Sequence, residues 1–344
     1  MSETSTTSVR SKCPTRSLRR FAAAVIALTV LAVLPATPAH AFHGTDVGAV
    51  RIAGSSRIHT AIAASQDLYA DHTAQVVVLS RSDGFADALA GAPLAVGLDG
   101  PLLLNPTGYL DGSVAQEIQR VLVPSGRVIL LGGEAALSRA VQDSLSDLGI
   151  ASDRVAGTSR YDTARQIADL ITILGGEPSY ILLATGLSFA DALSAGAVAS
   201  GVRGVVLLTQ DGAPAGPTSD FIAAHAAVPR YCFGGPACAA YPSSTHLVGQ
   251  NRYETATLAA QEFFTDSPIV GVANGQTPWD ALSGAAHVGG MGPLLLTDKA
   301  FLPGPTATYL SDHRTTIEIA FVYGGDAVVS TPVFNEIHQR VTAP

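Results

Sequence analysis

The sequence predicts an α/β protein built from three tandem copies of one Rossmann-like unit. Two observations support this prediction. The same short motifs occur three times in the same order, and short aliphatic runs typical of buried strands alternate with segments of helical apolar spacing. Strands that alternate with helices pair in parallel and need helices on both faces of the sheet. The composition, with 47% hydrophobic residues among 344, provides enough apolar material for such cores.

The first 41 residues have the pattern of an export signal. Three arginines precede an apolar run from Phe21 to Leu34, and the segment ends in Ala39-His40-Ala41, a small-x-small cleavage pattern. The run is shorter than the roughly 20 apolar residues that span a bilayer. We therefore expect cleavage after Ala41, secretion, and no membrane segment in the mature chain. A retained anchor is the alternative, and the pair Arg19-Arg20 leaves the choice between general and twin-arginine export open.

The mature chain is acidic. Removing residues 1–41 takes away five cationic side chains and one acid, which leaves a net charge of −12. Such a charge does not favour nucleic acid as a partner. Lys299 is the only lysine beyond residue 41, so arginine supplies nearly all of the positive charge. Arginine is the better residue for bidentate contacts with carboxylate or phosphate groups.

Two cysteines, Cys232 and Cys238, remain after the signal. An even number of cysteines in an exported protein predicts a disulfide. The alternative, a metal or redox pair, has no neighbouring ligand residues in the sequence. We therefore predict a small disulfide loop, placed where the second copy has an abbreviated end after its double glycine.

Each copy opens with the motif Gly-x-x-Arg-x-x-Thr-Ala and continues with Asp-Ala-Leu, an aliphatic run and a double glycine. The repeated arginines are Arg57, Arg160 and Arg252. The repeated aspartates are Asp87, Asp191 and Asp280. The double glycines are Gly132-Gly133, Gly234-Gly235 and Gly324-Gly325. Three occurrences in one order indicate three copies, which we place at 50–153, 154–246 and 247–344 behind the signal at 1–41.

The apolar spacing of the first copy defines the elements of the unit. The elements expected there are, in order, a helix at 58–70, a strand at 76–79, a helix at 85–96, a strand at 101–104, a helix at 114–122, a strand at 128–131 and a helix at 137–148. No linker rich in serine, proline or charge separates the copies. We therefore expect the copies to pack directly on one another.

The opening motif, the Phe-Ala-Asp-Ala-Leu segments at 85–89 and 189–193, the Pro-Leu-Leu-Leu run and the closing Gly-Gly resemble the cell-wall-binding repeat type 2. That module occurs in threes in surface and S-layer proteins of Gram-positive bacteria. The resemblance covers about residues 50–342. It implies Rossmann-like (toprim-like) βα repeats packed as a pseudo-threefold trimer. It also implies non-covalent attachment to the cell wall through an anionic polysaccharide or teichoic-type polymer.

In that family the aliphatic run is tied to polymer binding. The corresponding residues here are Leu102, Leu103, Leu104, Val206, Leu207, Leu208, Leu294, Leu295 and Leu296. Two copies depart from the family pattern. The first has Ile58-His59 where a tyrosine and an acid are expected, and the second has Val205 in place of proline. Either departure is able to weaken one site of the three.

Two roles stay open for the repeated arginines. They either recognise phosphate or carboxylate groups of the polymer beside a helix N-terminus, or they form internal ion pairs with the repeated aspartates. For the aspartates, stabilising a helix N-terminus or pairing with arginine is favoured over catalysis, because no second carboxylate recurs to complete an acid–base pair. The motif threonines are expected to bond backbone near the helix start, and the double glycines to need a positive φ or a close backbone approach.

The leading hypothesis is a wall-bound protein without catalytic activity, metal or cofactor. The nine histidines form no His-Glu-x-x-His motif, and the sequence has no Gly-x-Ser-x-Gly or Gly-x-Gly-x-x-Gly pattern. The alternative is a wall-lytic enzyme such as an N-acetylmuramoyl-L-alanine amidase, which needs one of the missing constellations. A nucleotide-binding enzyme would need a phosphate loop. Trp279 is a candidate for stacking on a sugar ring, although core packing is favoured.

Overall fold

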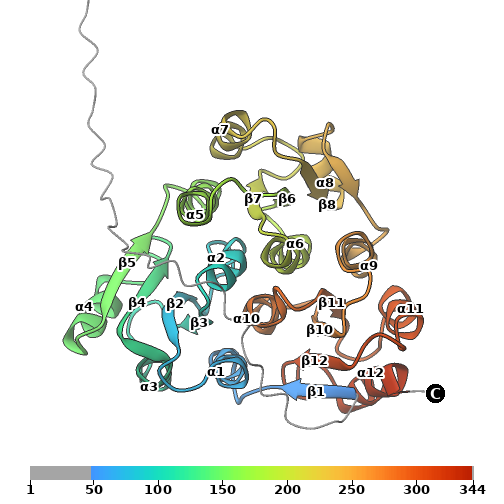
Figure 1. Cartoon of the computed structure of the whole chain (residues 1–344), viewed down its shortest axis with the longest axis horizontal. Coiled ribbons are helices and arrows are strands. Elements are labelled where there is room, and N and C mark those ends of the chain that lie inside the picture. The colour runs from blue at the N-terminus through green and yellow to red at the C-terminus, as the bar shows by residue number, and fades with distance from the viewer. Residues whose placement is uncertain (1–47, 343–344) are drawn as a thin grey trace, which may run out of the picture. The chain divides into compact units, whose positions relative to one another are not determined.

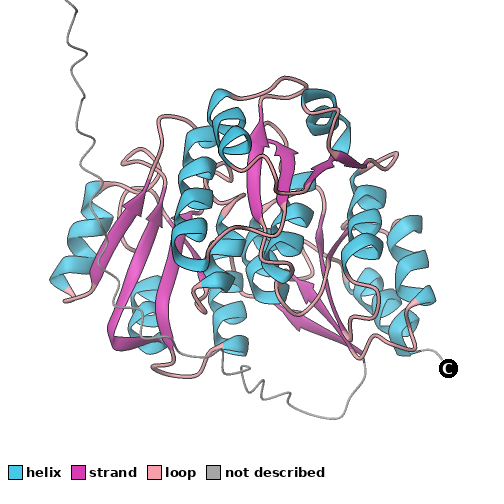
Figure 2. Ribbon diagram, turned by 45° about the horizontal axis from the view of Figure 1, so that its top comes forward, coloured by secondary structure: helices cyan, strands magenta, loops and turns pink. Residues whose placement is uncertain are grey.

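The computed structural model describes residues 48–342, which form three four-stranded parallel sheets and twelve helices (Figures 1 and 2). The α/β fold and the three tandem units are therefore confirmed. The predicted signal segment, residues 1–41, lies outside the described residues. From residue 48 to residue 342, every helix is too short or too polar to cross a bilayer.

The first sheet has the strand order β3-β2-β4-β5. Its strands are β2 (Ala74–Arg81), β3 (Leu102–Asn105), β4 (Leu122–Leu131) and β5 (Ala151–Val155). Its helices are α1 (Arg57–Leu68), α2 (Gly91–Gly97), α3 (Gly112–Val121) and α4 (Arg139–Asp147). The predicted alternation of helices and buried strands is confirmed along this copy.

The other two sheets repeat this order as β7-β6-β8-β9 and β11-β10-β12-β1. The elements of the second copy are α5 (Arg160–Gly175), β6 (Ile181–Thr185), α6 (Ala190–Gly201), β7 (Val205–Thr209), α7 (Gly216–Ala224), β8 (Arg230–Phe233), α8 (Gly234–Ala240) and β9 (Thr245–Leu247). The elements of the third sheet and its helices are β1 (Gly48–Ile52), α9 (Arg252–Phe263), β10 (Ile269–Asn274), α10 (Trp279–Val288), β11 (Leu294–Thr297), α11 (Gly304–Asp312), β12 (Ile319–Tyr323) and α12 (Thr331–Thr342).

Each sheet takes its fourth strand from the segment that leads into the next opening motif. β5 and β9 directly precede the second and third motifs, yet they pair with β4 and β8 of the copy before. The third sheet is completed from the start of the chain, because β1 pairs in parallel with β12 and places Gly48 opposite Ile319. The three copies are thus connected cyclically by backbone hydrogen bonds.

The helices that follow the central strands, α2, α6 and α10, contact one another (Figure 1). Their sequences are rich in alanine and glycine, which allows close approach. A Cβ on Gly196 of α6, for example, would lie only 3.6 Å from the Cβ of Ala92 in α2. The contact between equivalent helices of the three copies is the pseudo-threefold packing that the resemblance implies.

The helix expected at 85–96 is shorter in the structure, where α2 begins only at Gly91. The equivalent α6 begins directly before its repeated aspartate. Pro93 explains the difference, because proline lacks the N–H that would bond to the carbonyl of residue 89 and its ring crowds that carbonyl. Residues 85–90 form tighter turns instead, in which the N–H groups of Ala88 and Leu89 both donate to the carbonyl of Phe85.

The predicted disulfide is confirmed. Cys232 on β8 and Cys238 in the seven-residue helix α8 are joined with an S–S distance of 2.05 Å and a Cα–Cα distance of 5.1 Å. The structure also brings His246 to within 4.8 Å of both sulfur atoms, a neighbour that the sequence did not indicate. Two sulfurs bonded to each other are not thiolates, which is the form of cysteine that binds metal. We therefore assign the pair a structural role.

Replacing both Cys232 and Cys238 by alanine is expected to lower the free energy of unfolding by about 2 kcal/mol, because the cross-link restricts the unfolded chain over a short loop. Urea denaturation of the variant and of the unchanged protein measures the difference. Reducing agent should shift the unchanged protein to the same midpoint and leave the variant unaffected. An unchanged midpoint for the variant would refute a stabilising role.

Candidate functional site

The opening motif has the same geometry in all three copies. The glycine N–H donates to the threonine Oγ1 at 3.1 Å in the pairs Gly54–Thr60, Gly157–Thr163 and Gly249–Thr255. A Cβ on the first of these glycines would collide with the backbone and side chain of His59, so the turn needs glycine where it touches the helix. The expectation that the threonines bond backbone near the helix start is confirmed.

The repeated arginine stands at the first residue of α1, α5 and α9, directly after a capping residue. The capping side chains of Ser56, Ser159 and Asn251 each accept a hydrogen bond from a helix N–H. Such caps fix the direction in which the chain enters the helix. The position of the arginine relative to the sheet is therefore set by local backbone geometry.

Each repeated arginine donates one hydrogen bond to the carboxyl end of the neighbouring central strand. The Nη1 atom of Arg57 lies 2.8 Å from the carbonyl oxygen of Ser82, and Arg160 makes the same bond to Gly186 at 2.5 Å. Arg252 donates likewise to the carbonyl oxygen of Gly275. Within residues 48–342 these are the only hydrogen bonds of the three guanidinium groups, and none of the three forms a contact ion pair with a carboxylate.

These arginines lie at the junctions between copies. The Cζ atom of Arg57 is 4.0 Å from the ring centroid of Trp279, and that of Arg252 is 5.6 Å from the ring centroid of Phe189. In both cases the ring belongs to the copy whose sheet precedes the arginine. Trp279 is half-buried and also packs against the main core, so its ring supports the guanidinium and the core together. We call each of the three equivalent arginines, together with the ring and aspartate that the preceding copy brings to Arg57 and to Arg252, a junction cluster.

The charge of the next copy's arginine acts on two of the repeated aspartates. Burial raises the pKa of Asp191, and the charge of Arg252 opposes that rise. Burial likewise raises the pKa of Asp280, opposed by a hydrogen bond from Thr60 and by the charge of Arg57. The internal pairing considered from the sequence is thus a longer-range attraction between copies. At this longer range, the remaining N–H donors of these two arginines make no direct contact with a carboxylate.

The first residue of each double glycine lies against the side chain of the repeated aspartate. The first glycine of each pair has a positive φ, +89° at Gly132, +77° at Gly234 and +101° at Gly324. A Cβ at Gly132 would lie 2.6 Å from Oδ2 of Asp87, and the other two glycines approach Asp191 and Asp280 in the same way. Both reasons predicted for the double glycines, a positive φ and a close approach, are confirmed.

A second arginine position was missed in the sequence. The Nη1 atom of Arg51 donates to the carbonyl oxygens of Gly324 and Val329 at 2.6 and 2.9 Å, and Arg154 donates to that of Gly132 at 2.8 Å. These contacts join the fourth strands β1 and β5 to the double-glycine turn of the sheet that each completes. The sequence does contain a signal for this position, because Arg51 and Arg154 each stand three residues before the glycine of the opening motif. The third copy has His246 there.

The leucine runs form the strands β3, β7 and β11 and lie in the core. All nine side chains are at most 2% exposed. A polymer has no access to them in the folded protein.

The structure also brings together three residues that the sequence did not connect. His287 on α10 has Nδ1 2.8 Å from the hydroxyl of Tyr323 and Nε2 3.0 Å from Oδ2 of Asp67 on α1. The aspartate is 220 residues away in the chain. The tyrosine is fully buried, and burial raises its pKa well above the ordinary value. His287 and Tyr323 are buried whereas Asp67 is exposed, and the group links the third copy to the first.

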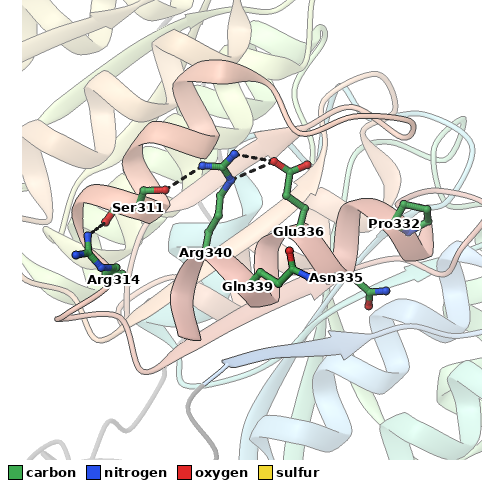
Figure 3. A pocket seen from close by; sticks show the side chains of 7 residues that line it. All are labelled: Ser311, Arg314, Pro332, Asn335, Glu336, Gln339 and Arg340. Atoms are coloured by element: carbon green, nitrogen blue, oxygen red, sulfur yellow. Dashed lines mark hydrogen bonds and ion pairs between the residues drawn. The ribbon is translucent and has the colours of Figure 1, made fainter. Parts of the chain in front are cut away.

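An open cavity of about 710 Å³ lies between α11 and α12, away from the repeated motifs (Figure 3). Its two arginines are engaged by the protein. Arg340 donates to Glu336 at 2.8 Å and to the hydroxyl of Ser311 at 3.0 Å, and Arg314 donates to the backbone carbonyl of Ser311 at 3.1 Å (Figure 3). The lining contains none of the repeated motif residues, so we do not assign the wall polymer to this cavity.

Replacing Gly324 by alanine is expected to lower the free energy of unfolding by more than about 1 kcal/mol, because the new Cβ is strained at positive φ and meets Asp280 and Val328. The matched control is Gly325→Ala, whose Cβ would meet nothing within 4 Å and which should change the value by less than about 0.5 kcal/mol. Equal effects of the two substitutions in urea denaturation would contradict the assigned role of the first glycine.

Replacing Asp280 by asparagine is expected to stabilise the protein at pH 7. The folded-state pKa of this carboxyl group is raised by burial above its ordinary value of 3.8, so ionisation costs folding free energy at any pH above the raised value. Below the ordinary value both folded and unfolded states are protonated and the cost disappears. Thermal unfolding at pH 7 and pH 4 should show a gain that shrinks as the pH falls. Destabilisation at pH 7 would mean that attraction to Arg57 outweighs burial.

The sequence is similar to two proteins of Bacillus subtilis. The N-acetylmuramoyl-L-alanine amidase LytC of Bacillus subtilis is 29% identical over 303 residues, which cover 86% of this chain and 59% of that protein. The amidase enhancer of the same organism is 30% identical over 160 residues, 46% of this chain and 21% of that one. The chain thus spans less than two thirds of the length of either relative.

The fold is similar to those of Cwp6 and Cwp8 from Clostridium difficile. The two solved structures match with TM-scores of 0.78 and 0.76, at 22% and 21% sequence identity. Each match covers 86% of this chain, and about half of the other, 48% and 52% respectively. At this level of identity the similarity establishes the three-copy fold.

The family model described as cell wall binding domain 2 (CWB2) matches the chain three times, at residues 51–142, 154–239 and 246–334. The matched segments begin at or beside the arginine or histidine that precedes each opening motif. Together they cover most of the described residues. The resemblance found in the motifs is thereby confirmed, and the chain belongs to the cell wall binding domain 2 family, of which it contains three tandem copies.

Proposed function

We propose that the mature chain is a secreted protein that attaches non-covalently to the cell wall by binding an anionic wall polymer at the three junction clusters. The observation that carries this proposal is the small number of hydrogen bonds that the repeated arginines make within the described residues. A guanidinium has five N–H donors, and each of these three uses one of them within the described residues. Phosphate and carboxylate groups match the free part of the fork.

The place of the arginines in the fold supports the same assignment. Each is bonded to the carboxyl end of a central parallel strand, where open α/β sheets bind their ligands. Each also stands at the N-terminus of a helix, which favours an anion. Because the mature chain carries a net charge of −12, attraction of an anionic polymer has to be local. Fixed arginines at three equivalent places provide such local sites.

The buried leucine runs support polymer binding indirectly. Each run forms the strand next to a central strand and ends where the loop begins. In copies one and three, the residue after the run holds that loop through its side chain, Asn105 to the carbonyl of Tyr109 and Thr297 to that of Phe301. We assign the runs to positioning the loop beside the arginine.

We propose a binding role without catalysis. Between residues 48 and 342, the only group of three histidine, cysteine or acidic ligands is Cys232, Cys238 and His246, and its cysteines form the disulfide. The similarity to LytC makes a wall-lytic amidase the second candidate. Turnover of purified peptidoglycan by the chain would favour that candidate over the binding role.

The test is co-sedimentation with purified sacculi of the producing organism, intact or stripped of wall polymers with hydrofluoric acid. The unchanged chain should bind the intact sacculi and lose most binding to the stripped ones. Alanine at Arg57, Arg160 or Arg252 should each weaken binding by roughly tenfold, the loss expected for charged hydrogen bonds.

The matched control is Arg139→Ala, which removes an arginine whose side chain is 71% exposed in a surface ion pair on α4. It should bind like the unchanged chain. Thermal unfolding shows whether each variant is folded. If the unchanged chain binds intact and stripped sacculi equally, polymer recognition is refuted. If the three arginine variants bind like the control, the arginines are structural.

A further inference from the structure

The loops after the leucine runs carry a feature that differs between copies. Five residues beyond the last residue of each run stand Tyr109, Ala213 and Phe301. The tyrosine is 60% exposed and the phenylalanine 56%. Among all phenylalanine, tyrosine and tryptophan side chains of residues 48–342, these two are the exposed ones. A single exposed aromatic side chain is common on protein surfaces, but exposure at one equivalent position in two copies singles this loop out as a candidate contact surface.

Hydrogen bonds connect the backbone carbonyl of each residue with an exposed ring to the junction arginine of the same copy. In the first copy, Arg57 bonds the carbonyl of Ser82, the N–H of Ser82 bonds the carbonyl of Asn105, and the side chain of Asn105 bonds the carbonyl of Tyr109. The relay consists of well-formed bonds of 2.8 Å each. The loop with the ring is thus held in fixed relation to the guanidinium.

The third copy repeats the relay with different side chains. Arg252 bonds the carbonyl of Gly275, and the N–H of Gly275 bonds the carbonyl of Thr297 at 2.7 Å. The hydroxyl of Thr297 lies 3.1 Å from the carbonyl of Asp298 and 3.4 Å from that of Phe301. The second copy keeps the first two bonds, through Gly186 and Thr209. There, however, the hydroxyl of Thr209 bonds Asp211, and the loop position holds alanine.

We infer that Tyr109 and Phe301 are stacking platforms for the sugar rings of a wall polysaccharide, each paired with the arginine that binds an anionic group of the same chain. This inference rests on the proposed function and specifies its ligand as an acidic polysaccharide. An exposed aromatic ring offers an apolar face, which suits the C–H face of a pyranose ring. The first and third copies thus carry two-part sites, and the second provides an arginine alone.

The contributions of the arginine and of the aromatic ring to binding can be distinguished by varying the salt concentration. Attraction between the arginines and an anionic polymer is screened as ionic strength rises, whereas stacking of apolar faces is not. Replacing Tyr109 or Phe301 by alanine should therefore weaken binding to intact sacculi by roughly threefold to tenfold. The factor should be the same at 0.05 M and 0.5 M sodium chloride. The loss caused by Arg57→Ala should shrink at the higher salt concentration.

Conservative and matched variants complete the experiment. Tyr109→Phe and Phe301→Tyr keep the ring and should bind like the unchanged chain. Ile173→Ala removes the most exposed large apolar side chain, 78% exposed on α5, and should also have no effect. The side chains of Tyr109, Phe301 and Ile173 are all exposed, so melting temperatures should stay within a few degrees of the unchanged value.

The inference is overturned if the double variant Tyr109→Ala/Phe301→Ala binds intact sacculi like the unchanged chain while the arginine variants do not. It is also overturned if the double variant loses binding equally on stripped sacculi, because the rings would then contact peptidoglycan. Equal binding of the unchanged chain to both kinds of sacculi would instead refute the proposed function itself. The failures of the two proposals are therefore separate outcomes.

Discussion

Backbone pairing between each sheet and the strand that leads into the next copy is the constraint on which the other features depend. β5, for example, completes the first sheet and ends five residues before Arg160. The chain therefore delivers the arginine of one copy to the edge of the copy before it. The same pairing places Arg51 and Arg154 against double-glycine carbonyls of the preceding sheet. Each junction cluster is thus a product of strand exchange and does not exist within a single copy.

The motif residues could be predicted because their causes are local. A glycine that touches a helix, a threonine that bonds its N–H and a double glycine at positive φ are all determined within a few residues. The strand exchange could not be predicted, because β5 and β9 are short and partly polar and their partners are chosen by the packed sheets. The contact of His287 with Asp67 joins residues 220 positions apart, beyond any sequence pattern. The late start of α2 depends on Pro93, which was visible but was outweighed by the apolar spacing.

The copies share a fold but differ where a ligand would bind. The second copy keeps its arginine and aspartate, yet it has alanine at the loop position and a disulfide-braced short helix at its end. The third copy supplies the tryptophan that supports Arg57 of the first. Burial raises the pKa of Asp191 and of Asp280, so keeping these carboxylates costs stability. Proteins commonly retain such costs at sites that serve function.

The pairing of β1 with β12 also determines the order in which the molecule assembles. Arg51 and the two carbonyls that it bonds are 273 and 278 residues apart, so this contact joins segments near the two ends of the described chain. The first two sheets need only neighbouring segments, whereas the third has to wait until both ends of the domain are present. Until then β12 has an open edge, which is a place where a second chain is able to add a strand. Completion of the last sheet is accordingly the step that joins segments farther apart in the sequence than the other two sheets require.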